Sequence, residues 1–145
     1  MSAAYFDSSV LLAVLLNESR SEVCEPIWNA QKIRVSSILL GAECWTGVRR
    51  HFLRVGIGIQ AKWKEERIAF LEKALDQVEL KSVDSEIMDI LKKNPKLADC
   101  RTLDAVHLAS AIYFREQADG ELFFVTLDPQ MRESALKFQF KVLPA

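Results

Sequence analysis

Apolar and polar positions follow two different spacings along the chain. Short apolar runs of strand length are separated by stretches whose apolar residues recur every three or four positions, the spacing of one helix face. The short runs predict strands at 3–6, 32–36, 78–83, 122–126 and 138–143. The longer stretches predict helices at 8–16, 21–30, 38–53, 60–76, 84–93 and 103–117, and a short helix that begins at Asp128-Pro129.

This order of elements predicts the fold class. Strands that alternate with helices favour a mostly parallel sheet with helices on both faces. Right-handed crossovers then align the carboxyl ends of the strands along one edge of the sheet. We therefore expect residues 1–145 to form a single domain of three-layer α/β/α architecture, with a mostly parallel, five-stranded sheet.

Residues that cap or break helices set the predicted boundaries. Pro26 is best tolerated in the first turn of a helix, so the helix at 21–30 is expected to begin after Ser21. Glycine and proline interrupt the pattern at Gly56-Ile57-Gly58, Asn94-Pro95 and Gly120. Hydroxyl side chains are expected to cap three helices, namely Ser8 or Ser9, Ser36 or Ser37, and Thr102.

Four acidic residues lie beside predicted strand or helix ends. Asp7 follows the first strand and Asp128 follows the strand at 122–126, so both are expected at the carboxyl edge of the sheet, where open α/β sheets bind ligands. Asp104 lies in the first turn of its helix, where the helix dipole favours an anion. Glu43 is expected to reach inward from its own helix. Asp7 alone would be read as a helix cap, but four acids that converge on one cleft suggest chemistry.

Carboxylates that lie close together repel one another unless a proton or a cation intervenes. A set of oxygen donors suits Mg²⁺ or Mn²⁺, whereas zinc would favour sulfur ligands. One tight site or two sites are both possible, and two-metal sites hold their ions roughly 4 Å apart during phosphodiester cleavage. A water activated by metal attacks in such sites, so no nucleophilic side chain is required.

The overall charge of the chain neither favours nor excludes a polyanionic substrate. The formal net charge is −1, but if four acids are committed to metal the rest of the chain carries +3. Half of the residues are apolar and 27% are charged, which is typical of a globular protein. The three cysteines have no paired spacing and are expected to be reduced thiols, as in a cytoplasmic protein. The longest apolar run, Val10 to Leu16, is too short to cross a bilayer, and no secretory signal is evident.

Four segments together resemble, in order and spacing, the motifs of PIN-domain ribonucleases, and most closely the VapC toxins of toxin–antitoxin pairs. The resemblance spans nearly the whole chain. The segment from Leu103 to Ala109 is the most specific of the four. The segments are Tyr5-Phe6-Asp7-Ser8-Ser9, Val35-Ser36 followed by Glu43, Arg101-Thr102-Leu103-Asp104-Ala105-Val106-His107-Leu108-Ala109, and Phe124-Val125-Thr126-Leu127-Asp128.

The resemblance implies an endoribonuclease that depends on Mg²⁺ or Mn²⁺, with RNA as substrate, a cognate antitoxin protein as partner and a homodimer as the assembly. It also implies that the catalytic, metal-binding acids are Asp7, Glu43, Asp104 and Asp128, of which the last is the one that could act through water. Ser8 or Thr126 would orient a ligand or a water molecule behind them.

Other residues near these motifs have simpler interpretations. The apolar neighbours of His107 favour a packed structural role over a ligand role, and Asp99 is expected to be a cap or a solvated charge. The tryptophans are expected in the core or an interface. A basic cluster after Glu43 is either a solvated face or a surface for RNA phosphates or an acidic partner segment, and consists of Arg49, Arg50, His51 and Arg54.

Two other functions compete with a nuclease. A PIN-like fold without catalysis would serve only partner binding or dimerisation, and its acids would bind no metal. Phosphoryl transfer through an aspartyl-phosphate on Asp7 is disfavoured, because Ser9 stands where dehalogenase-like enzymes place a second aspartate. No glycine-rich segment resembles a nucleotide-binding loop.

Overall fold

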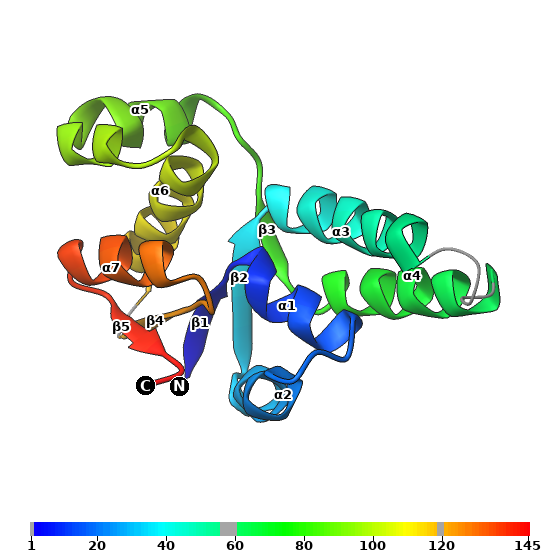
Figure 1. Ribbon diagram of the computed structural model, residues 1–145. Coiled ribbons are helices and arrows are strands. Elements are labelled where there is room, and N and C mark those ends of the chain that lie inside the picture. The colour runs from blue at the N-terminus through cyan, green and yellow to red at the C-terminus, as the bar shows by residue number, and fades with distance from the viewer. Residues whose placement is uncertain (1, 56–60, 119–120) are drawn as a thin grey trace.

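A five-stranded sheet, parallel throughout, forms the centre of the computed structural model, which describes residues 2–55, 61–118 and 121–145. The strand order is β3-β2-β1-β4-β5, so the first strand of the chain lies in the middle of the sheet (Figure 1). The strands are β1 (Ala3–Phe6), β2 (Ile33–Ser37), β3 (Glu79–Lys81), β4 (Leu122–Val125) and β5 (Lys141–Leu143).

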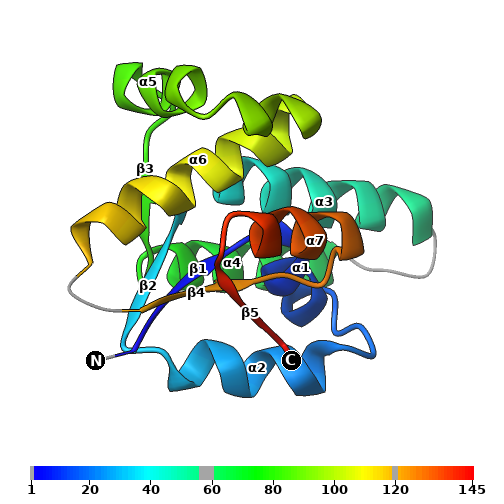
Figure 2. The same cartoon turned by 90° about the vertical axis from the view of Figure 1, so that its left-hand side faces the viewer.

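Helices cover both faces of the sheet, as Figures 1 and 2 show. One face packs against α1 (Ser8–Leu15), α2 (Ser21–Ala30), α3 (Leu39–Val55) and α4 (Ala61–Leu75). The other face packs against α5 (Ser85–Lys93), the short 3₁₀-helix η2 (Pro95–Asp99), α6 (Thr102–Gln117) and α7 (Pro129–Lys137). The predicted three-layer α/β/α fold with a parallel, five-stranded sheet is therefore confirmed.

The alternation of side chains along the strands divides the core between the two faces. On β1, Ala4 and Phe6 belong to the apolar cluster under α1, α2, α3 and α4, whereas Tyr5 belongs to the cluster under α6. On β4, Phe124 points to the same face as Tyr5, and the two rings stack with centroids 5.1 Å apart. Both faces of these strands are apolar because both are covered, which is the pattern of a parallel sheet.

The predicted strands all form, but the two edge strands are shorter than their apolar runs. β3 covers three residues of the predicted 78–83, and β5 covers three of the predicted 138–143. Both have a neighbouring strand on one side only, so fewer residues there find ladder partners. The predicted break at Gly56-Ile57-Gly58, the helix start at Gln60 and the break at Gly120 lie outside the described residues.

Three predicted helix starts were wrong. The carboxylate of Asp7 caps α1, in place of Ser8 or Ser9. Helix α2 begins at Ser21 and contains Pro26 in its interior, because the tertiary packing of its Cys24 and Trp28 face outweighs one lost backbone hydrogen bond. Thr102 lies within α6 and does not cap it, because the cap position belongs to Arg101, without a side-chain hydrogen bond.

Other boundaries agree with the sequence pattern. The hydroxyl of Ser37 accepts a hydrogen bond from the backbone N–H of Leu39 (3.1 Å), so it caps α3 as predicted. Asp84 and Asp128 cap α5 and α7. Cys24 and Cys44 are buried free thiols and Cys100 is half-buried. Among the helices that the structure describes, none combines the length and the apolar character needed to cross a membrane.

The stack of Phe124 on Tyr5 predicts a large stability effect. Phe124 is fully buried, whereas Phe70 on α4 keeps 44% of its surface exposed. We expect Phe124→Ala to lower the free energy of unfolding by about 3–5 kcal/mol, because it leaves a cavity between the sheet and α6. Phe70→Ala should lower it by about 1 kcal/mol or less. Urea unfolding measures both, and equal losses would contradict this account of the core.

Candidate active site

The carboxyl ends of the two central strands bring Asp7 and Asp128 to one edge of the sheet. Phe6 lies opposite Val125 in the parallel ladder, and the backbone N–H of Asp7 donates to the carbonyl of Val125 (3.2 Å). Asp128 follows β4 and begins α7, and Asp104 lies in the first turn of α6. The predicted meeting of the two strand ends at this edge is therefore observed.

Asp7 is a buried carboxylate held by hydroxyl groups. Its side chain is 4% exposed. One oxygen, Oδ1, accepts hydrogen bonds from the backbone N–H (3.0 Å) and the hydroxyl (2.5 Å) of Ser9. The other oxygen, Oδ2, accepts a hydrogen bond from the hydroxyl of Thr126. Both oxygens are thus fixed in direction, one by α1 and one by the segment after β4.

The hydroxyl groups that hold Asp7 are themselves fixed by backbone donors. Ser9 Oγ accepts from the N–H of Leu127 (2.9 Å), and Thr126 Oγ1 accepts from the N–H of Asp128 (3.0 Å). Each hydroxyl therefore turns its proton toward Asp7. Thr126 was one of the two residues predicted to support the acids. Ser9, and not Ser8, holds the other position, since Ser8 makes no side-chain hydrogen bond to Asp7 among the described residues.

Burial raises the pKa of Asp7 above its ordinary value of 3.8. The cause is the loss of water around the charged form. The hydrogen bonds from Ser9 and Thr126 and the charge of His107 act in the opposite direction, because each favours the ionised carboxylate, but they do not cancel the effect of burial.

Glu43 reaches the same region from α3 and contacts His107 of α6. His107 Nε2 lies 2.5 Å from Glu43 Oε1, and His107 Nδ1 lies 2.6 Å from the hydroxyl of Tyr5. His107 is 2% exposed, whereas the side chain of Glu43 is 29% exposed. The packed position predicted for His107 agrees with this burial, but its ring also joins the central strand to an acidic residue. The sequence carried no signal for the contact with Tyr5.

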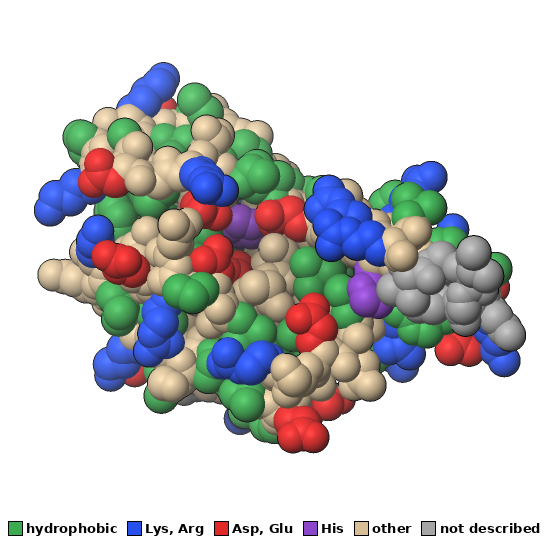
Figure 3. Space-filling model, viewed as in Figure 1, with side chains coloured by type: hydrophobic (Ala, Val, Ile, Leu, Met, Phe, Trp, Pro, Cys, Tyr) green, Lys and Arg blue, Asp and Glu red, His purple; other side chains and the backbone are tan. Residues whose placement is uncertain are grey.

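Electrostatics places Asp104 beside the other acids. Partial burial raises the pKa of Asp104, and the negative charges of Asp128 and Glu43 raise it further. The charges of His107 and Arg101 act in the opposite direction. Figure 3 shows acidic side chains gathered around a histidine in a hollow of this face, between α3, α6 and α7. The charges of Asp128 and Glu43 therefore reach Asp104, which links three of the four predicted acids.

The carboxylate oxygens of this hollow are ligands that suit a hard divalent cation. In the structure, however, several of these side chains are engaged in other hydrogen bonds. All four acids offer oxygen, and within the described part of the chain none of them pairs with Lys or Arg. As the side chains stand, no group of three or more His, Cys, Asp or Glu among the described residues is close enough to hold a metal ion. The residue types fit Mg²⁺ or Mn²⁺, and Asp7, Glu43 and Asp104 are the residues that would hold one.

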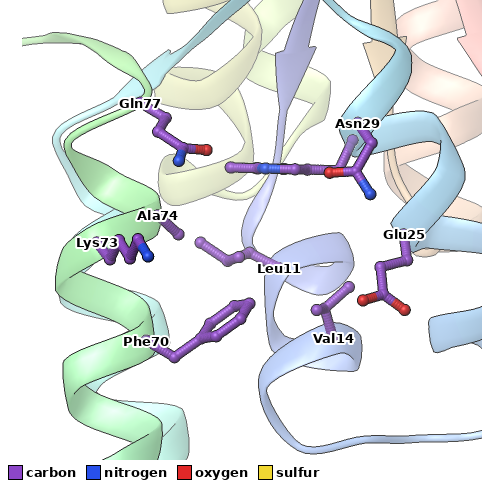
Figure 4. A pocket seen from close by; sticks show the side chains of 9 residues that line it. Leu11, Val14, Glu25, Asn29, Phe70, Lys73, Ala74 and Gln77 are labelled. Carbon is purple, nitrogen blue, oxygen red and sulfur yellow. The ribbon is translucent and has the colours of Figure 1, made fainter.

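A second cavity lies away from the acids and offers no comparable chemistry. It has a volume of about 270 Å³ and opens between α1, α2 and α4 (Figure 4). Leu11, Val14 and Phe70 point into it, and Glu25 is its one acidic lining residue. The hollow at the carboxyl edge of the sheet is therefore the stronger candidate for an active site than this cavity.

The basic cluster lies on α3, while the three tryptophans are spread over α2, α3 and α4. Arg49 and Arg50 are exposed, and the guanidinium of Arg49 lies 5.2 Å from the centre of the Trp45 ring. Trp45 is 44% exposed, so of the two predicted places, core or interface, it does not lie in the core, whereas Trp28 is buried. Asp99 is exposed at the end of η2, as expected of a solvated charge.

The fold is a three-layer α/β/α domain with acidic residues at the carboxyl edge of its sheet, and comparison with known proteins supplies the family. The family model of the PIN domain matches residues 4–136, so this chain belongs to the PIN domain family, as its motifs predicted. Among solved structures, the chain is similar to the Mycobacterium tuberculosis VapC20 toxin, which cleaves the sarcin–ricin loop. That likeness has a TM-score of 0.61 and 14% identity, and covers 91% of this chain and 95% of the toxin. No curated protein matches the chain.

The raised pKa of Asp7 predicts that its charge destabilises the fold when no metal is bound. Because the folded state holds the Asp7 proton more tightly than the unfolded chain does, stability falls as the pH rises from about 4 until Asp7 is ionised in the folded state. In EDTA, Asp7→Asn should therefore raise the free energy of unfolding by about 1 kcal/mol or more at pH 7.

The control for this effect is Asp89→Asn, which changes an exposed aspartate on α5. Urea unfolding between pH 4 and pH 7 measures both variants against the parent. The gain in Asp7→Asn should grow with pH and that in Asp89→Asn should stay near zero. A gain that is the same at every pH would contradict the assignment to the Asp7 charge.

Proposed function

We propose that this protein is a divalent-metal-dependent endoribonuclease and the toxin of a toxin–antitoxin pair. One observation supports this most directly. A buried aspartate, Asp7, lies at the strand ends beside the segment that carries Asp128, the charges of Asp128 and Glu43 raise the pKa of Asp104, and none of the four acids pairs with Lys or Arg among the described residues. Membership of the PIN domain family and the similarity to a VapC toxin support the same function.

In the proposed mechanism, Asp7, Asp104 and Glu43 hold the metal, and Asp128 completes the set directly or through water. When bound, Mg²⁺ or Mn²⁺ would activate a water molecule and offset the charge that develops on the phosphodiester. The protein contributes the direction of the ligands. Ser9 and Thr126 fix both oxygens of Asp7, and the helix start at Asp104 places its carboxylate at the same edge.

The proposed partners follow from the proposed activity. RNA is the substrate, a cognate antitoxin protein would keep the enzyme inactive, and a homodimer in the cytoplasm is the expected assembly. The exposed arginines on α3 suit either RNA phosphates or an acidic segment of the antitoxin. The competing function is a PIN-fold binding or dimerisation module without catalysis, whose acids bind no metal.

The proposed function predicts RNA cleavage that requires both the metal and the acids. We expect cleavage of a structured RNA in Mn²⁺ to stop in excess EDTA, and to fall by about a thousandfold or more in Asp7→Asn and in Asp104→Asn, because each removes a ligand that the transition state needs. Glu133→Gln, an exposed acid on α7, should cleave at the parental rate. Full activity in EDTA or in Asp7→Asn would rule out the mechanism.

Calorimetric titration with Mn²⁺ separates the nuclease from the binding module. Micromolar binding that is lost in Asp7→Asn and in Asp104→Asn, but kept in Glu133→Gln, supports the nuclease. A folded parent protein that neither binds Mn²⁺ nor cleaves RNA supports the binding module.

A further inference from the structure

The buried contacts of His107 carry an inference about how Glu43 is directed. The ring lies in the apolar interior under α6, where an apolar residue of similar size would pack without polar partners. A buried imidazole is unfavourable unless both nitrogens are hydrogen-bonded. Here both have partners, and these come from two other elements, Tyr5 of β1 and Glu43 of α3.

The hydrogen-bond inventory fixes the order of the donors. An ionised carboxylate accepts only, so Nε2 carries the proton that is donated to Glu43. Nδ1 shares its hydrogen bond with the Tyr5 hydroxyl. The Tyr5 oxygen in turn accepts the backbone N–H of Ser37 (3.2 Å). The chain of hydrogen bonds thus runs from β2 through the central strand to α6, and ends on Glu43.

These linked hydrogen bonds hold one oxygen of the Glu43 side chain, Oε1, in place. Glu43 is half-buried, and its other oxygen, Oε2, makes no hydrogen bond among the described residues. A glutamate has several rotatable bonds, so an unsupported Glu43 would spend little time directed at the other acids. Fixing Oε1 limits the directions that Oε2 can take.

We propose that His107 is a positioning residue, which acts through Glu43 and with Tyr5 as its own support. The inference rests on the proposed function, since its consequence is tighter binding of the metal by Glu43. Partners behind metal ligands typically change affinity by about 10–100-fold. His107 itself touches neither the RNA nor the metal in this account.

Three variants test the proposal by Mn²⁺ calorimetry on folded protein. His107→Leu keeps the volume and removes both hydrogen bonds, so the affinity for Mn²⁺ should fall by about 10–100-fold. His107→Gln keeps an N–H donor for Glu43 and should stay within about threefold of the parent. Tyr5→Phe removes only the hydroxyl and should give an intermediate loss, which keeps the test available if His107→Leu does not fold.

A purely structural role would give a different result. In that case His107→Leu would change the melting temperature but leave the Mn²⁺ affinity of the folded protein unchanged, and this outcome overturns the proposal. Failure of the parent to bind Mn²⁺ would overturn the proposed function as well. In RNA cleavage, the loss should appear at Mn²⁺ concentrations below saturation and should be recovered at saturating Mn²⁺, with KM for RNA unchanged.

A separate observation concerns a cavity beside Asp128. It has a volume of about 330 Å³ and is lined by Thr126 and Asp128 of the site, together with Arg20 and Arg132. Arg132 Nη1 donates to the carbonyl of Pro144 (2.6 Å), so its guanidinium is held in place, while Arg20 is exposed in front of α2. Two cations far apart in the sequence therefore meet next to the acids.

This arrangement suits a phosphate that neighbours the one being cleaved. An RNA strand that approaches four carboxylates needs positive charge close by to offset the repulsion. Guanidinium groups bind phosphate with directed hydrogen bonds. We infer that the cavity takes the backbone phosphate adjacent to the scissile one, with Arg20 and Arg132 as its contacts. This inference also rests on the proposed function.

The test uses Arg20→Gln and Arg132→Gln, with Lys92→Gln on the exposed face of α5 as the control. Binding of a single-stranded RNA is measured in an Asp7→Asn background, so that the RNA stays intact. Each arginine variant should bind several-fold more weakly, with the slope of log affinity against log salt reduced by about 0.7. Unchanged affinity for RNA and an unchanged salt slope would overturn the inference. An acidic partner peptide would then be the alternative ligand of the cavity. Absence of RNA binding in every protein would overturn the proposed function instead.

Discussion

The candidate site is organised around one buried side chain, the carboxylate of Asp7 at the end of the central strand. Burial disfavours the ionised form of this carboxylate. Two hydroxyls and one backbone N–H donate hydrogen bonds to it and favour the ionised form. These donors are neutral, so they direct the carboxylate without cancelling its charge. A Lys or Arg at the same place would have neutralised the charge of Asp7, so the carboxylate would no longer attract a metal cation.

The middle position of β1 explains how this charge acquires partners from distant parts of the chain. β2 and β4 flank β1, so Asp7 and its neighbours have supporting groups on either side. From β2, the hydroxyl of Ser36 donates to the carbonyl of Phe6 (2.6 Å), while Thr126 follows β4 and holds Asp7. Side chains alternate along β1, so Tyr5 points to the face of the sheet opposite to that of Ala4 and Phe6, and its hydroxyl therefore reaches α6.

The parts that the sequence predicted are those encoded in local pattern. The strand before Asp7 and the helix start before Asp104 have short-range signals, so the meeting of the acids followed from the topology of a parallel sheet. The contact of Tyr5 with His107 joins residues 102 positions apart, and that of His107 with Glu43 joins residues 64 apart. No periodicity records such pairs. The hydrogen bond from the hydroxyl of Ser9 to Asp7 was not predicted either, because the direction of that hydroxyl depends on the first turn of α1, which Asp7 caps.

The four acids differ in how many of their carboxylate oxygens are fixed by hydrogen bonds. Asp7 is fixed at both oxygens and Glu43 at one, whereas Asp128 uses one oxygen to cap α7 through the backbone N–H of Gln130 (2.9 Å). A carboxylate committed to its helix can still act through its field, and the raised pKa of Asp104 is in part the effect of Asp128. Asp128 thereby increases the negative potential of the hollow without having to turn toward the other acids. In the proposed mechanism, Asp7, Glu43 and Asp104 would therefore be the direct ligands, and Asp128 would act through charge or through water.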